Sequence, residues 1–262
     1  MRSKRLLCGT AAFILAAVLL STQLPCRAGS SLSAARLSVL AALEEIGFSA
    51  SVATPDSTLA KAASADYSLL DNSCVIGHSH AVGMQMALDM IEPDYIAEVG
   101  IMTERMLVHG SFTLPDGSIG SLRRGLEGKS YERIFVLLGT NDMVGADSYL
   151  PVFKSSMETL LDAVAEWQPD AEICLLSIAP ISKGFYEYCY YNHGLTRETM
   201  DDYNRALRSI AMGREIDFLD ITTPLSDEKG YLAAAYDRGD GLHFNAEGNR
   251  VILDTIMSYL EG

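Results

Sequence analysis

The segment Cys74-Val75-Ile76-Gly77-His78-Ser79-His80 decides how this chain folds. It begins with a short apolar run, and a glycine, two histidines and a serine lead from that run into a helical pattern over residues 80–90. A short apolar run that passes directly into a helix is typical of a strand buried on both faces of a parallel sheet. Ser79 would then lie at the turn from strand to helix, near the positive end of the helix dipole.

The rest of the chain continues the alternation of strands and helices. Further strands are predicted at roughly Tyr95 to Val99, Ile134 to Leu138, Ile173 to Ile178 and Ile216 to Leu219. Helices are predicted at Tyr149 to Trp167, at Arg197 to Met212 and, behind the N-cap Asn245, at Ala246 to Leu260. This order predicts an α/β fold with a five-stranded parallel sheet, whose ligands bind beyond the carboxyl ends of the strands.

Composition narrows the choice of partners. The chain has 262 residues, 48% of them hydrophobic, so it can bury a substantial core. Its 20 Lys and Arg against 34 Asp and Glu give a formal net charge of -14. Polyanions are held by clustered cations, so this balance argues against nucleic acid and against an anionic membrane surface as partners.

The N-terminus has the pattern of a secretory signal. Arg2, Lys4 and Arg5 precede an apolar run at residues 6–20, and residues 26–28 offer a small-residue cleavage site before Gly29. We therefore expect residues 1–28 to be a signal peptide, residues 29–68 a helical lead-in and residues 69–262 the main domain. Cleavage would make the protein secreted or extracytoplasmic. The alternative is an uncleaved N-terminal membrane anchor, which would be its one link to a membrane.

Three of the predicted strand ends carry reactive or polar side chains. Ser79 follows the first strand, although a serine there also fits a plain helix cap. Residues 139–142, which include Asn141, follow the third strand. Before the last helix, Asp240 precedes His243 by three residues. That spacing allows Asp240 to accept from His243 Nδ1 while Nε2 faces outward, as a general base requires.

Together these segments resemble the sequence blocks of the SGNH/GDSL hydrolases, a family of serine esterases. Residues 77–79 (Gly-His-Ser) stand at the nucleophile block, Val99-Gly100 at the second, residues 139–142 (Gly-Thr-Asn-Asp) at the third and residues 240–243 (Asp-Gly-Leu-His) at the last. The resemblance implies a three-layer α/β/α fold with a flavodoxin-like sheet, and no metal or organic cofactor. The sequence departs from the family at His78, where the family usually has Asp.

The resemblance also implies roles for individual residues. Ser79 would be the nucleophile, His243 its general base and Asp240 the group that orients the imidazole. The backbone N–H groups of Ser79 and Gly100 and the side chain of Asn141 would form the oxyanion hole. The expected substrate is an acyl ester, with a short chain such as acetyl, of a carbohydrate or another small alcohol.

Other functions remain open on the sequence alone. His78 and His80 form a His-x-His pair that, with His243 or Asp240, would suit a metal-dependent hydrolase, although alternate residues can point apart and no cluster of carboxylates accompanies them. A non-catalytic carbohydrate-binding relative and an acyltransferase are further alternatives. The aromatic-rich stretch Phe185 to His193 would form a wall or lid over the site, or else pack as a surface loop.

Overall fold

The computed structural model describes residues 67–88 and 93–262. The predicted signal segment and nearly all of the predicted lead-in lie outside these residues. In the described part, a short 3-10 helix, η2 (Tyr67–Leu70), leads into the first strand. No helix in the described ranges has both the length and the apolar character that a membrane span requires.

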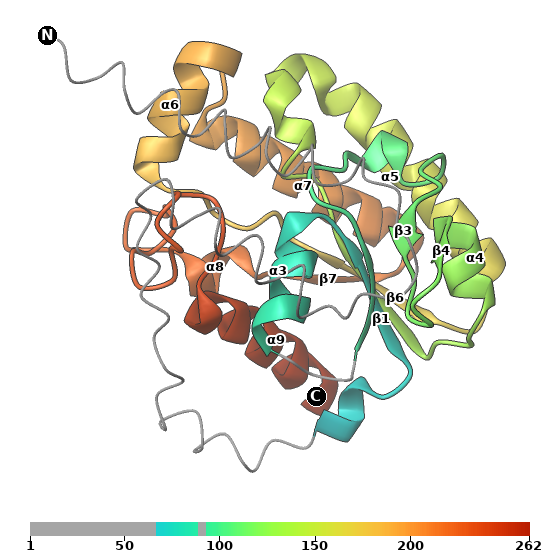
Figure 1. Cartoon of the computed structure of the whole chain (residues 1–262). Coiled ribbons are helices and arrows are strands. Elements are labelled where there is room, and N and C mark those ends of the chain that lie inside the picture. Colours follow the sequence, from blue (N-terminus) through green and yellow to red (C-terminus); the bar gives the residue numbers. More distant parts are fainter. Residues whose placement is uncertain (1–66, 89–92) are drawn as a thin grey trace, which may run out of the picture. The chain divides into compact units, whose positions relative to one another are not determined.

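A parallel sheet forms the centre of the fold (Figure 1). Its strands are β1 (Ser73–Gly77), β2 (Asp94–Ala97), β5 (Arg133–Leu137), β6 (Glu172–Leu176) and β7 (Asp217–Leu219). They lie in the order β2-β1-β5-β6-β7, and every neighbouring pair is parallel. The five predicted strands are therefore all present, and this order places the end of β1 between the ends of β2 and β5.

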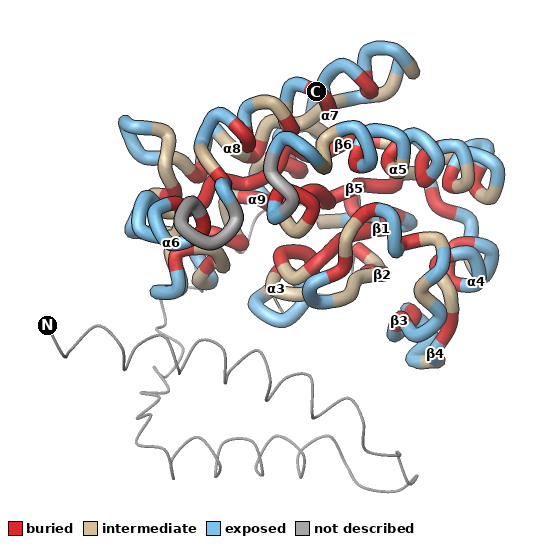
Figure 2. The backbone as a smooth tube through the Cα atoms, turned by 90° about the horizontal axis from the view of Figure 1, so that it is seen from above, coloured by how far each residue is buried: buried red, intermediate tan, exposed pale blue. Residues whose placement is uncertain are grey.

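Each strand contributes side chains to two hydrophobic clusters, one on either face of the sheet. On β5, Ile134 and Val136 belong to one cluster, whereas Phe135 and Leu137 belong to the other. Successive side chains of a strand point to opposite faces, so a continuous apolar run is what a sheet covered on both sides needs. Figure 2 shows the strands as the buried centre of this part of the chain.

Helices cover both faces and complete three layers (Figure 1). The helices are α3 (Ser79–Leu88), α4 (Leu122–Glu127), α5 (Ala146–Trp167), α6 (Lys183–His193), α7 (Arg197–Arg214), α8 (Thr222–Leu225) and α9 (Ala246–Glu261). Buried side chains of α3, α8 and α9 join the cluster of Phe135, and those of α4, α5, α6 and α7 join the cluster of Ile134. The predicted N-cap Asn245 is confirmed, because its side chain accepts from the backbone N–H of Gly248.

Some elements were not predicted. A small antiparallel hairpin, β3 (Phe112–Thr113) and β4 (Ile119–Gly120), and the short helix α4 lie between β2 and β5. The aromatic stretch after β6 is the helix α6, not a loop. Two single 3-10 turns, η3 (Thr103–Arg105) and η4 (Asp142–Gly145), follow β2 and β5. These two turns shape the edge of the sheet at which the candidate site lies.

Candidate active site

Ser79 lies at the tight turn between β1 and α3. The turn has room only for glycine at position 77, because a Cβ there would lie 2.6 Å from Ala81 Cβ and 2.9 Å from the carbonyl oxygen of Leu137. Ser79 is the first residue of α3 and is partly exposed. The sequence prediction of a serine raised at the carboxyl edge of the sheet is thus confirmed.

The side chain of His78 caps the N-terminus of α3. Its Nδ1 accepts a hydrogen bond from the backbone N–H of His80 at 3.2 Å, which serves one of the free donors at the helix N-terminus. The neutral ring therefore carries its proton on Nε2, and that atom has no partner among the described residues. Burial, and secondarily the nearby His243, lower the pKa of His78 to about 3.

His243 and Asp240 meet Ser79 from the loop before α9. His243 Nδ1 lies 2.8 Å from Asp240 Oδ2, and His243 Nε2 lies 3.0 Å from Ser79 Oγ. The other oxygen of Asp240 accepts the backbone N–H groups of Leu242 and His243 at 2.9 and 2.7 Å. The structure thus brings together the three side chains that the sequence singled out, in a continuous line from carboxylate to hydroxyl.

The electrostatics of Asp240 favour its charged form. Burial by itself raises the pKa of Asp240, but hydrogen bonds from the His243 ring and from the backbone N–H groups of His243 and Leu242 outweigh it. The net result is a pKa held below the usual range of an aspartate. Asp240 therefore stays ionised and can stabilise an imidazolium when His243 takes up a proton.

The other two residues named for the oxyanion hole follow β2 and β5, the strands on either side of β1. Gly100 follows β2 with φ +76°, and an added Cβ there would meet nothing within 4 Å. The backbone N–H groups of Ser79 and Gly100 donate to no acceptor within the described residues. Asn141 Nδ2 donates one hydrogen bond to the carbonyl of Ile101 at 2.8 Å, which leaves its second hydrogen available.

Asp142, which was quoted in the third block but given no role, ties these two loops together. Its carboxylate accepts the backbone N–H of Thr103 at 3.1 Å and the Thr103 hydroxyl at 3.0 Å. Burial raises the pKa of Asp142 to about 6, against the lowering effect of these hydrogen bonds. Asp142 and Asn141 together fix the loop that carries Gly100 to the loop that follows β5.

The two histidines of the His-x-His pair lie close together. The rings of His78 and His80 do not point apart but contact each other edge to face, with centroids 4.7 Å apart. The reason is that Ser79 and His80 belong to the first turn of a helix, where alternate residues do not lie on opposite faces. Among the residues that the structure describes, no group of three or more His, Cys, Asp or Glu side chains is placed to hold a metal ion.

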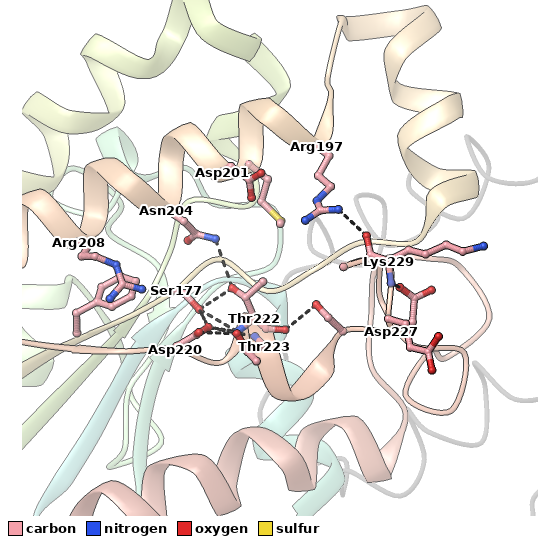
Figure 3. Close-up of a pocket in the computed structure, with 15 residues that line it drawn as sticks. Ser177, Arg197, Asp201, Asn204, Arg208, Asp220, Thr222, Thr223, Asp227 and Lys229 are labelled. Atoms are coloured by element: carbon pink, nitrogen blue, oxygen red, sulfur yellow. Dashed lines mark hydrogen bonds between the residues drawn. The ribbon is translucent and has the colours of Figure 1, made fainter.

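A polar cavity of about 480 Å³ lies beyond the ends of β6 and β7, between α7 and the loop after α8 (Figure 3). Its floor is a closed hydrogen-bond network in which Ser177 Oγ accepts the backbone N–H groups of Ile221 and Thr222. Asn204 clamps the backbone of Ile178 from α7. None of the catalytic candidates lines this cavity, and its network holds the edge of the sheet in place.

The aromatic stretch has one residue beside the loop that carries His243. A Cβ at Gly241 would lie 3.2 Å from Phe185 Cβ, so α6 packs closely on this loop. Tyr186 is buried and donates its hydroxyl to Met200 Sδ, whereas Tyr188 is 53% exposed. The stretch therefore divides between core packing and an exposed aromatic surface.

Comparisons with known proteins agree with this geometry. Residues 110–251 match the family model described as the GDSL-like Lipase/Acylhydrolase family. The matched region contains Asn141, Asp240 and His243, whereas Ser79 and Gly100 lie before it. No curated protein matches the chain in sequence. The match confirms the resemblance that the sequence blocks indicated.

Solved structures show the same fold. A Streptococcus pneumonia protein that carries the provisional name platelet activating factor is 24% identical, with a TM-score of 0.56 over 88% of this chain and 100% of its own. A GDSL-like lipase from Bacteroides thetaiotaomicron is 14% identical, with a TM-score of 0.56 over 72% and 87%. An acetylxylan esterase from Geobacillus stearothermophilus is 14% identical, with a TM-score of 0.52 over 72% and 94%. These likenesses confirm the predicted α/β fold class.

Proposed function

The chain belongs to the GDSL-like lipase/acylhydrolase family and is an ester hydrolase, and from this premise we propose that it cleaves short acyl esters of carbohydrates by way of an acyl-Ser79 intermediate. The observation that carries the proposal is the line of contacts in which Asp240 holds one nitrogen of His243 and Ser79 Oγ lies 3.0 Å from the other. A serine hydroxyl is a weak nucleophile until a positioned base takes its proton.

In the proposed reaction, His243 Nε2 accepts the Ser79 proton while Oγ attacks the ester carbonyl carbon. The resulting oxyanion accepts hydrogen bonds from the N–H groups of Ser79 and Gly100 and from the second amide hydrogen of Asn141. The imidazolium then returns its proton to the leaving alcohol, and the C–O bond breaks. A water molecule, deprotonated by the same imidazole, hydrolyses the acyl-serine and restores the enzyme.

Three observations support a carbohydrate acetyl ester as the substrate. The fold is similar to that of an acetylxylan esterase. The exposed Tyr188 and the half-buried Phe185, whose rings lie 6.4 Å apart, give α6 an aromatic surface beside the catalytic loop, and aromatic rings stack well on sugars. The N-terminal segment has the pattern of an export signal. We propose that residues 1–28 are cleaved, that the mature enzyme acts outside the cytoplasm and that residues 69–262 form its catalytic domain.

The substrate proposal is tested with purified enzyme on a chain-length series of p-nitrophenyl esters and on acetylated xylan. We expect kcat/KM for the acetate to exceed that for the octanoate by at least about tenfold, because each misfit methylene lowers transition-state binding. We also expect acetate release from the polysaccharide, with no change after EDTA. A preference for the octanoate contradicts the short-chain proposal, and loss of activity with EDTA supports the metal-dependent alternative instead.

Asp240 is predicted to act by orienting His243, and Asp240→Asn tests this role. We expect kcat to fall by about 1000-fold or more, because the amide presents a donor where His243 Nδ1 needs an acceptor. The control is Asp237→Asn in the same loop, since Asp237 accepts the backbone N–H groups of Gly239 and Gly241 and makes no hydrogen bond to the His243 ring. The measurements are kcat on p-nitrophenyl acetate and thermal unfolding. An equal loss of kcat in both variants would show that kcat depends on the integrity of the loop and not on the contact between Asp240 and His243.

A further inference from the structure

We infer that His80 is a positioning residue. It holds His243 in place after acylation of Ser79 has removed the hydrogen bond between His243 and Ser79. This inference rests on the proposed role of Ser79 as the nucleophile. His80 directly follows Ser79 in α3 and is 2% exposed. It is not part of the line of contacts from Asp240 to Ser79, and the sequence gave it a role only as a ligand in the metal-dependent alternative.

Besides its contact with His78, the His80 side chain contacts the segment that carries the base. Its Nε2 donates to the carbonyl oxygen of Leu242, the residue before His243, at 3.1 Å. Its ring lies edge to face against the His243 ring, with centroids 5.7 Å apart and an interplanar angle of 85°. The ring also packs on Phe244 at 4.7 Å. His80 therefore contacts three consecutive residues of the loop.

The chemistry of the site requires His80 to be neutral with its proton on Nε2. A carbonyl oxygen can only accept, so the nitrogen that faces Leu242 must carry the hydrogen. The other nitrogen, Nδ1, is buried and has no partner among the described residues. Burial, followed by the nearby His78 and His243, holds the pKa of His80 well below its usual range. The donor to Leu242 is thus present throughout the working pH range.

Two glycines give the loop that carries His243 a conformational freedom that the bond from His80 limits. Gly239 and Gly241 have φ values of 109° and 81°, and glycine leaves a chain more conformational freedom than any other residue. Within the described residues, two side-chain hydrogen bonds join α3 to the segment 237–244, one from Ser79 to His243 and one from His80 to Leu242.

Only one of these two bonds survives the reaction. When Ser79 Oγ carries the acyl group, it has no proton to share with His243, and the first bond is lost. The bond from His80 to Leu242 is untouched by the chemistry. His243 must still be in place at that stage to activate the hydrolytic water, so the loss of His80 should slow deacylation more than acylation.

The test is a pair of variants of the full chain assayed with p-nitrophenyl acetate. His80→Phe keeps a ring of similar size but removes the donor, whereas the amide nitrogen of His80→Gln reaches the position of Nε2. We expect His80→Phe to lower kcat by about 10- to 100-fold, since a misplaced catalytic group of this kind costs about that much. KM should fall with kcat, and stopped-flow traces should show a burst of p-nitrophenolate near one equivalent per enzyme. His80→Gln should stay within about fivefold of wild type and show no burst.

A third variant allows the inference to be tested even if His80→Phe does not fold. His80→Asn is polar and small, but its amide does not reach Leu242, so it should reproduce the burst even if His80→Phe fails to fold. Folded His80→Phe or His80→Asn enzyme with wild-type kcat overturns the inference. A fall in kcat without a burst, or no rescue by His80→Gln, also overturns it. Failure of the nucleophile proposal is distinguished separately, because Ser79→Ala would then retain activity.

Discussion

Ser79→Ala is expected to lower kcat/KM for p-nitrophenyl acetate by at least about 10⁴-fold, because removing the nucleophile of a serine hydrolase removes the covalent pathway as a whole. The side chain makes one hydrogen bond, to His243, and is partly exposed, so thermal unfolding should barely change. The measurement compares the initial rates of wild type and variant at equal protein concentration, with that concentration determined by absorbance and not by active-site titration.

A second serine, Ser182 in the segment between β6 and α6, provides the matched control. Ser182 lies against Gly241, and its hydroxyl accepts the backbone N–H of Phe185, but it does not contact His243. We expect Ser182→Ala to retain activity within about tenfold of wild type. If Ser79→Ala kept a tenth or more of the wild-type rate, the acyl-serine pathway would be wrong, and a mechanism with a directly activated water would have to replace it.

His78→Asn is expected to change how stability depends on pH. His78 is 1% exposed, and its folded-state pKa of about 3 lies below the unfolded value of about 6.5. As the pH falls below 6.5, the unfolded chain binds the proton first, so stability is lost at about 1.4 kcal/mol per pH unit until the pH approaches 3. Over that window the loss caused by His78 is on the order of 4 kcal/mol.

The asparagine variant keeps a cap for α3 but has no group to protonate. At pH 7 the variant should be less stable than wild type, because the smaller side chain leaves a void. As the pH falls, the free energy of unfolding of wild type should decrease more than that of the variant. Urea unfolding at pH 7, 5.5 and 4.5 measures the free energy of unfolding of both proteins. If the free energy of unfolding changed with pH by the same amount in wild type and variant, the assignment of His78 as a buried neutral histidine would be contradicted.

Much of the fold was predictable from local pattern. The central strands β1 and β5 are almost entirely buried runs because both of their faces are covered, and on β5 Phe135 and Val136 belong to opposite clusters. The helix α6 was not predicted. Its residue Tyr186 packs into the core against Met200, which lies on α7, and a contact between two elements is not visible in the local sequence pattern. The hairpin β3–β4 has only two residues per strand, too few to show an alternation.

The site was predictable to a different degree for each residue. The spacing of Asp240 and His243 was enough to predict their contact, since a loop of three residues brings the two side chains together. The contact of His80 with the carbonyl of Leu242 joins residues 162 positions apart, and no side-chain identity encodes a bond to a backbone carbonyl. The contact between the His78 and His80 rings arises at the start of a helix, and the sequence left open whether the two side chains point apart.

The most direct test of the central claim is to identify the residue that becomes covalently modified. Wild-type enzyme and His243→Ala are treated with a fluorophosphonate, and the adduct is located by peptide mass spectrometry. The account predicts a single adduct on Ser79, formed at least about 100-fold more slowly in His243→Ala, because the hydroxyl then lacks its base. An adduct on another residue, or labelling of Ser79 at the same rate in both proteins, would contradict a nucleophile activated by His243.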